Sequence, residues 1–287
     1  MAHPDTIPPI LDFTMKEAKR IWDEPRHLTD SLAKITKFAS FVDYDTRPIS
    51  EYRPSNVYDY LEHRKDTYGN SDATLNRYVA ALSKVFKHYD DEYSTNITPR
   101  LKWKKEPLNR PRFFTETELT QLEVILKNCP NDWAWHFVVI ALKSGMRKGE
   151  ILGIGRTKSQ VPGSQPYGLI AEDYSSVHLY RTKNGTERVV PLHPDAVEAL
   201  KAMDSEPAKA FDHHKFYREW GRARDRIAPD DETFVFHVCR HTAATNLAIK
   251  KWNTVQIGGI LGHLSQATTA RYIQSPEEVN TQMINSL

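Results

Sequence analysis

Apolar residues recur at helical spacing through the first third of the chain. Between residues 28 and 44 they stand three and four positions apart, which predicts a helix with one buried face. The same spacing predicts a short helix over residues 57–64 and a longer one over 71–89, with Ser71 as its amino-terminal cap. This part of the chain is therefore expected to be helical.

The rest of the chain alternates between helical and strand-like patterns. Residues 153–192 contain strand-like runs, broken by a glycine- and proline-containing loop over 156–168, and Asn184-Gly185 marks a hairpin turn. Helical patterns surround this segment at 113–127, 132–142, 194–203, 213–227, 237–249, 255–261, 267–273 and 276–284. The predicted fold class is mainly α with a small β-sheet (α+β).

Changes in composition divide the chain into segments. Residues 1–27 are proline-rich, with one short helical pattern around residues 14–22, and are too few for a core of their own, so we expect an amino-terminal arm or a single helix. Residues 28–98 form a helical domain and residues 113–287 a larger domain. Between them, residues 99–112 carry three prolines, six basic residues and one acidic residue, a composition typical of an extended linker.

The composition limits the possible classes of protein. Hydrophobic residues make up 39% of the chain, which supports real cores, and no apolar run is long enough to cross a membrane. The two cysteines have neither disulfide nor zinc spacing, and the first residues do not resemble a signal peptide, so we expect a cytoplasmic protein. With a net charge of only +2, any nucleic-acid binding must rely on a locally basic surface.

Polar residues interrupt an otherwise core-like stretch near the carboxyl end. His237 and Arg240 have the spacing of one helical turn, His263 follows a glycine-containing apolar run, and Tyr272 comes shortly afterwards. Arginine pairs with two phosphate oxygens, histidine moves protons near neutral pH, and tyrosine can act as a nucleophile. These residue types together indicate phosphate chemistry.

Earlier stretches add further cations. Arg147 follows the break Ser144-Gly145 after an apolar helix, and Glu150 is near enough to fix its guanidinium. Lys183 stands at the tip of the predicted hairpin, from which it can reach into a groove.

In order, these stretches resemble the tyrosine recombinases, the phage integrases and Xer-type recombinases. The words SGMRKGEIL, TKNGTERVVPL, CRHTAATNL and LGHLSQATTARY carry the resemblance, which covers residues 112–287 well and 28–95 more loosely. Cys239 stands where the family more often has leucine. An isolated arginine after a helix break, a His-x-x-Arg pair on a helix or a tyrosine near the end of a chain usually has only a structural role. Here their combined order and spacing favour a catalytic site.

The resemblance implies a helical core-binding domain, a catalytic domain and a role for each residue. Tyr272 would be the nucleophile, Arg147 and Arg240 would hold the non-bridging oxygens, and His263 would add a hydrogen bond. Lys183 would protonate the leaving 5′ oxygen and His237 would assist proton transfer. Cations near Tyr272 are expected to lower the cost of its phenolate, about 4 kcal/mol at pH 7.

DNA contacts are expected in two places. The polar face of the helix over 71–89 carries Arg77 and Lys84 together with Asn76, Lys87 and His88; a solvated face is the plainer explanation, and the resemblance favours DNA. The lysines of the linker, Lys102, Lys104 and Lys105, are expected to follow the DNA backbone as a strap, in preference to a merely solvated charge run.

The implied partners are double-stranded DNA with core-type sites, further copies of the chain in a tetramer, and accessory DNA-bending or excisionase proteins. We expect no cofactor and no metal, because nucleotide-binding and carboxylate-cluster motifs are lacking. An integrase of a phage or mobile element is the favoured interpretation and an Xer-like resolvase of chromosome dimers the second. The rival classes are a DNA-binding module without catalysis, a type IB topoisomerase and a metal-dependent nuclease.

Overall fold

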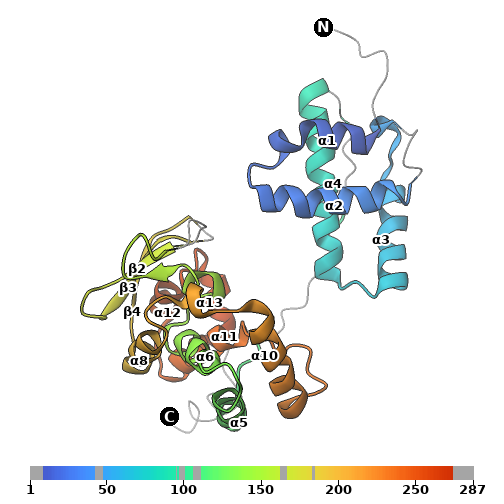
Figure 1. The fold of residues 1–287 in the computed structure, drawn as a ribbon. Coiled ribbons are helices and arrows are strands. Elements are labelled where there is room, and N and C mark those ends of the chain that lie inside the picture. Colours follow the sequence, from blue (N-terminus) through green and yellow to red (C-terminus); the bar gives the residue numbers. More distant parts are fainter. Residues whose placement is uncertain are drawn as a thin grey trace, which may run out of the picture. The chain divides into compact units, whose positions relative to one another are not determined.

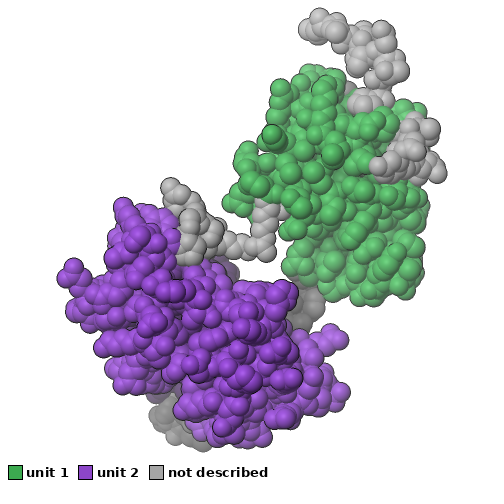
Figure 2. All heavy atoms as spheres, in the orientation of Figure 1, with its two compact units in different colours: residues 1–108 green, residues 109–287 purple. Residues whose placement is uncertain are grey.

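The chain folds into two compact units, residues 1–108 and 109–287 (Figure 2). The computed structural model describes residues 9–42, 48–94, 96, 101–105, 111–161, 167–182 and 185–273. Each unit has its own hydrophobic core, and each is described by itself below.

The first unit is helical throughout its described part. Its elements are α1 (Ile10–Ile21), α2 (Pro25–Ala39), the short 3-10 helix η1 (Ile49–Glu51), α3 (Pro54–Tyr68) and α4 (Asp72–Tyr93). The Ser71 hydroxyl accepts a hydrogen bond from the Thr74 backbone N–H and so caps α4, as the sequence predicts. The longest helix, α4, packs against α1, α2 and α3 (Figure 1).

The segment expected to be an arm or a single helix contains helix α1 and contributes to this core. Helix α1 begins at Ile10, before the predicted helical stretch, and Ile10, Phe13 and Ile21 are almost completely buried against the other helices. Residues 10–22 are therefore part of the helical unit rather than a separate arm. The core they enter already exists in residues 28–93, so the short segment needs no core of its own.

The described part of the linker lies on the first unit. The side-chain amide of Asn76 accepts from the Lys104 backbone N–H at 2.8 Å and donates to the Lys104 carbonyl at 2.9 Å. The Lys102 backbone N–H donates to the Tyr58 hydroxyl at 2.9 Å. These contacts hold residues 101–105 against α3 and α4, and the side chains of Lys102, Lys104 and Lys105 stay exposed.

The second unit combines helices with a small sheet that lies at one side of them (Figure 1). Its helices are α5 (Glu116–Lys127), α6 (Trp133–Ser144), α7 (Lys148–Ile151), α8 (Pro194–Ala202), α9 (Pro207–Ala210), α10 (His213–Ile227), α11 (Val238–Ile249), α12 (Thr254–Leu261) and α13 (Gln266–Ile273). The apolar helix α6 packs against α5, α8 and α11 (Figure 1), and half of its side chains are buried. The helix predicted over residues 276–284 lies outside the described residues.

The sheet has four strands in the order β1-β2-β3-β4. Strands β1 (Ile154–Gly155) and β2 (Tyr167–Ile170) pair in parallel, whereas β2 with β3 (Ser176–Arg181) and β3 with β4 (Arg188–Pro191) are antiparallel. Leu179 pairs with Arg188 in the predicted hairpin, and Gly185 has a φ of 72°, which favours glycine in its turn. The mainly helical α+β class is confirmed.

Arg112, which the sequence places at the end of the linker, belongs to the second unit. Its guanidinium donates to the carboxylates of Glu118 and Asp231 and lies 5.0 Å from the ring centroids of Phe114 and Phe234. Arg112 is therefore part of the packed structure of this unit.

Candidate active site

A left-handed glycine brings Arg147 to the site. Helix α6 ends at Gly145, whose φ is 65°, and a Cβ there would lie 2.7 Å from a methyl carbon of Leu261. This close contact joins the end of α6 to α12, and the chain then turns so that Arg147 precedes α7. Glycine at position 145 therefore permits both the left-handed end of α6 and its close contact with Leu261.

Glu150 holds Arg147, as its spacing predicts. The carboxylate accepts from the Arg147 backbone N–H and from its guanidinium, both at 2.8 Å, and the glutamate is completely buried. Burial raises the pKa of this carboxyl, but hydrogen bonds and charge from Arg188 and Arg147 outweigh it, so the pKa stays below its usual value. Glu150 is therefore a buried carboxylate anion.

Arg240 is buried at the centre of the site. Its guanidinium donates to the carbonyls of Gly145 and Leu261, each at 2.7 Å, and lies 3.0 Å from Nε2 of His263. Burial and the nearby Arg147 lower its pKa to about 10, so it remains charged at pH 7. These contacts fix the guanidinium between the end of α6 and the end of α12.

His263 is a hydrogen-bond acceptor in this arrangement. Its Nε2 faces Arg240, which has only donors, and its Nδ1 lies 2.9 Å from the Thr269 hydroxyl. Burial and the charges of Arg240, Arg147 and Arg188 lower its pKa to about 4. The neutral ring therefore carries its proton on Nδ1, and Nε2 can donate to a phosphate oxygen only after it gains a proton.

Tyr272 on α13 lies beside these groups and is 9% exposed. Its ring stacks on that of His263, with centroids 6.1 Å apart and an interplanar angle of 10°. Burial raises the pKa of its phenol, and Arg240, Arg271 and Arg147 offset this only in part. The arginines therefore lower the cost of the phenolate, as expected, but burial outweighs them.

His237 lies at the amino-terminal end of α11 and is exposed, and its ring centroid is 4.8 Å from that of His241. Sequence reasoning left His241 aside, yet its ring lies 5.7 Å from that of Tyr272. Burial and the neighbouring His237 lower the pKa of His241 to about 4. Its position directly after Arg240 in a helix is the only sequence signal for it, and that signal is weak.

Lys183 lies outside the described residues, and its predicted role stays a proposal. The described residues on either side of it are joined by hydrogen bonds: the Gly185 N–H donates to the Thr182 carbonyl, and the Thr182 hydroxyl donates to the Thr186 carbonyl.

Sequence reasoning also missed Arg188. Arg188, on β4, makes a bidentate ion pair with Glu150, with N–O distances of 3.1 and 2.7 Å. It also donates to the Ile260 carbonyl at 2.9 Å. A glutamate in an apolar stretch such as GEILGI needs cationic partners when buried, and that requirement was the available signal.

The site brings together two arginines, a neutral histidine and a tyrosine, with a buried carboxylate behind them. Among the described residues no group of three or more His, Cys, Asp or Glu side chains is arranged to hold a metal ion. An anion placed between Arg147 and Arg240 would meet donors on both guanidiniums, and the Tyr272 phenol lies beside the same groups. This arrangement suits attack of a phenol oxygen on a phosphodiester.

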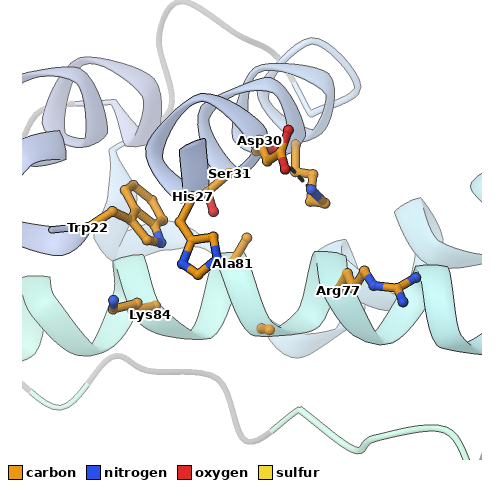
Figure 3. A pocket seen from close by; sticks show the side chains of 9 residues that line it. Trp22, His27, Asp30, Ser31, Arg77, Ala81 and Lys84 are labelled. Atoms are coloured by element: carbon orange, nitrogen blue, oxygen red, sulfur yellow. Dashed lines mark hydrogen bonds between the residues drawn. The ribbon is translucent and has the colours of Figure 1, made fainter. Parts of the chain in front are cut away.

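Arg77 and Lys84 lie on one face of α4 in the first unit. Both are exposed and border a groove of about 390 Å³ between α2 and α4 (Figure 3). Lys84 Nζ is 5.9 Å from the ring centroid of Trp22, and His27 lies between the two helices. The groove is lined by Trp22, His27, Asp30, Ser31, Lys34, Arg77, Ala80, Ala81 and Lys84.

Two residues expected on the same polar face are placed differently. Asn76 is 4% exposed and binds the linker backbone. His88 lies toward α1, where its Nε2 is 3.6 Å from a carboxylate oxygen of Glu17. A helical spacing identifies a polar face, but it does not reveal which polar residues the linker and a neighbouring helix cover.

A mainly helical unit with one small sheet that holds this constellation has the architecture of a tyrosine recombinase. Residues 112–278 match the phage integrase family, more than half of the chain, and the chain belongs to that family. It is a site-specific DNA recombinase of the tyrosine type. No curated protein matches the chain by sequence. No helix in the described residues is long and apolar enough to cross a membrane.

Solved structures share the fold at low sequence identity. The integrase of transposon Tn1549, in complex with a circular intermediate DNA, is 13% identical with a TM-score of 0.72, covering 98% of this chain and 100% of that one. The XerH recombinase bound to palindromic difH substrate is 15% identical with a TM-score of 0.68, covering 99% of each chain. A lambda integrase fragment bound to a core site is 15% identical with a TM-score of 0.66, covering 91% and 94%.

Proposed function

We propose that this recombinase is an integrase that inserts or excises the DNA of a phage or mobile element inside a bacterial cell. It would cut each strand through a covalent 3′-phosphotyrosine at Tyr272. The observation that carries this proposal is the packing of Tyr272 against His263, whose Nε2 lies 3.0 Å from the buried Arg240 guanidinium. A nucleophile and its anion-binding groups thus occupy one site.

In the proposed reaction, the Tyr272 oxygen attacks the scissile phosphorus while Arg147 and Arg240 hold the non-bridging oxygens. The bond from phosphorus to the 5′ oxygen breaks as the bond to tyrosine forms, and Lys183 gives the leaving oxygen its proton. His237 accepts the proton of the phenol. Because one phosphodiester replaces another, no nucleotide is consumed and the reverse attack by a 5′ hydroxyl rejoins the strand.

His263 would take part only after the DNA arrives. Its neutral ring accepts from Arg240 in the free protein, and a bound phosphate anion favours the protonated ring. Protonated Nε2 then becomes a donor to the phosphate, and the charge that develops in the transition state strengthens that hydrogen bond.

Binding would use both units. The groove between α2 and α4, with Arg77 and Lys84 on its rim, would meet one face of the duplex, and Lys102, Lys104 and Lys105 would contact phosphates. The Asn76 and Tyr58 contacts with residues 101–105 would present these lysines in an ordered, extended segment. Phosphate contacts of this kind supply affinity without choosing a sequence.

A tetramer on two paired sites, with accessory bending or excisionase proteins, is the proposed assembly. Apolar side chains at the end of α11 and the start of α12 are about half exposed or more: Ile249 at 46%, Trp252 at 49% and Val255 at 63%. Such side chains would suit contact with a neighbouring copy. An Xer-like resolvase would use the same site chemistry, and its target DNA would distinguish it from an integrase.

The function is tested by trapping covalent intermediates on bacterial DNA that carries the element. The protein is incubated with this DNA in EDTA without nucleotide, denatured, and the protein-linked fragments are sequenced. We expect linkage at one short site at the element's ends, with protein on the 3′ phosphate. Scattered linkage with relaxation of supercoils would favour a topoisomerase, and cleavage that requires Mg²⁺ would favour a nuclease.

A further inference from the structure

Arg188 is almost enclosed behind the proposed catalytic groups. Its side chain is 8% exposed and that of Glu150 is 1% exposed, whereas that of Arg147 is 22% exposed. Arg188 contacts both carboxylate oxygens of Glu150, and Arg147 reaches the same oxygens through its backbone and its guanidinium. The carboxylate is thus shared between a covered arginine and a more exposed one.

Because Arg147 and Arg188 share the Glu150 carboxylate, more positive charge is left for a bound phosphate. A buried carboxylate requires a counter-ion, and if Arg147 were its only partner, the positive charge that should meet a phosphate would already be neutralised. With Arg188 in place, the three arginines Arg147, Arg188 and Arg240 and the one glutamate leave two net positive charges. Without it, one would remain.

Arg188 also contacts the chain just before His263. Its Nε donates to the Ile260 carbonyl, and a Cβ at Gly262 would lie 2.7 Å from its Nη1. Gly262 ends α12 with a φ of 68°, and His263 N–H donates back to the Gly258 carbonyl. The guanidinium therefore touches both the carboxylate behind Arg147 and the turn that carries His263.

We propose that Arg188 is a positioning residue for strand cleavage: it neutralises Glu150 so that Arg147 keeps its charge for the phosphate, and it supports the turn before His263. This inference rests on the proposed function, because it assigns Arg147 to the scissile phosphate. An ion pair that served stability alone would have no effect on the charge available to the phosphate.

The test compares Arg188→Met, Arg188→Lys, Glu150→Gln and the double variant Arg188→Met/Glu150→Gln. Cleavage rates are measured in single turnover on a nicked substrate that carries the trapped site, alongside DNA affinity and thermal unfolding. Arg188→Met should cleave about 100-fold more slowly, a decrease of the size found when one transition-state donor is removed. Its affinity should change much less, because many other groups hold the DNA.

The double variant separates charge from structure. Glu150→Gln removes the negative charge that Arg188 neutralised, so adding it to Arg188→Met should restore the rate by at least about tenfold. Arg188→Lys keeps the positive charge but loses the bidentate contact with Glu150, so its cleavage rate should fall between those of the wild type and Arg188→Met. Arg222 is a matched control, since it pairs with the buried Glu219 at 3.1 Å outside the site; Arg222→Met should cleave like the wild type.

Several results would overturn the inference. One is an Arg188→Met variant that cleaves at the wild-type rate. Another is a folded double variant as slow as, or slower than, Arg188→Met, which would assign Arg188 to stability alone. If Arg188→Met does not fold, the same comparison is made with Arg188→Lys against Arg188→Lys/Glu150→Gln. Absence of covalent product from the wild type would instead contradict the proposed function itself.

Discussion

The groups around Tyr272 show how one buried carboxylate organises several arginines. Glu150 accepts from Arg147 and Arg188, and Arg240 is held separately by the Gly145 and Leu261 carbonyls. The carboxylate and these carbonyls thereby keep like charges close together. Burial and the like charges lower the pKa of Arg240 and of His263, and a bound anion would relieve the repulsion between these cations.

Sequence spacing predicted the Arg147–Glu150 pair, because a cap residue and the third residue of the helix are neighbours by geometry. It did not predict that Arg188 shares Glu150, since that ion pair joins a strand to a helix far away in the sequence. The burial of Tyr272 and the tautomer of His263 depend on tertiary packing, and local patterns contain no information about them.

The histidines of the site predict how stability depends on pH. Folding lowers the pKa of His263 and of His241 from 6.5 to about 4. Between these values the unfolded chain binds more protons than the folded one, so stability is present above pH 6.5 and is lost as the pH falls. The melting temperature should therefore rise between pH 5 and pH 7.5.

His241→Gln and His263→Gln, combined in one chain, should flatten this rise, since glutamine does not titrate. His214→Gln serves as a control on an exposed histidine and should leave the slope unchanged. An unchanged slope in the double variant would show that other groups cause the acid sensitivity.

At the level of elements, most helices could be predicted because their apolar positions repeat at a regular spacing. Helix α10 runs from His213 to Ile227, the predicted bounds, and α4 begins after the predicted cap Ser71. Helix α1 was predicted to be shorter, because it starts next to Pro9 and its first turn is buried only by packing against other helices. Such packing is invisible in a local pattern.

The β3–β4 hairpin supports a prediction about Lys183, whose proposed role is proton donor to the 5′ oxygen. Lys183→Ala should strongly slow cleavage of an ordinary duplex. A substrate with a 5′-bridging sulfur has a far better leaving group and should restore this variant's rate. The measurement is single-turnover cleavage of both substrates.

Arg147→Ala and Arg240→Ala provide the comparison, because their proposed partners are the non-bridging oxygens, which the sulfur does not change. The sulfur substrate should leave both arginine variants slow. Equal restoration of all three variants, or of none, would mean that another group donates the proton.

For the whole molecule, a net charge of +2 means that DNA affinity must come from local basic surfaces. We propose that the exposed lysines of residues 101–105 are one such surface; Asn76 holds the backbone that carries them. The sequence predicted the linker from its prolines and charge. It could not predict that the linker lies on α3 and α4, because that packing uses a polar face expected to meet DNA.

Replacing Lys102, Lys104 and Lys105 with alanine should weaken binding to the specific site and to random DNA by similar factors. The slope of log affinity against log salt should decrease by up to about 0.9 for each phosphate that a lysine no longer neutralises. Fluorescence anisotropy over a range of salt concentrations measures both quantities. Weakening confined to the specific site would mean that these lysines read sequence.

The central claim, that Tyr272 attacks DNA, is tested most directly by mass spectrometry of the trapped complex. Nuclease and protease digestion of the wild-type complex should yield the peptide containing Tyr272 with a nucleotide joined through its 3′ phosphate. Tyr272→Phe should bind the same DNA and give no adduct. An adduct on another residue, a 5′ linkage, or adducts formed by Tyr272→Phe would contradict the account.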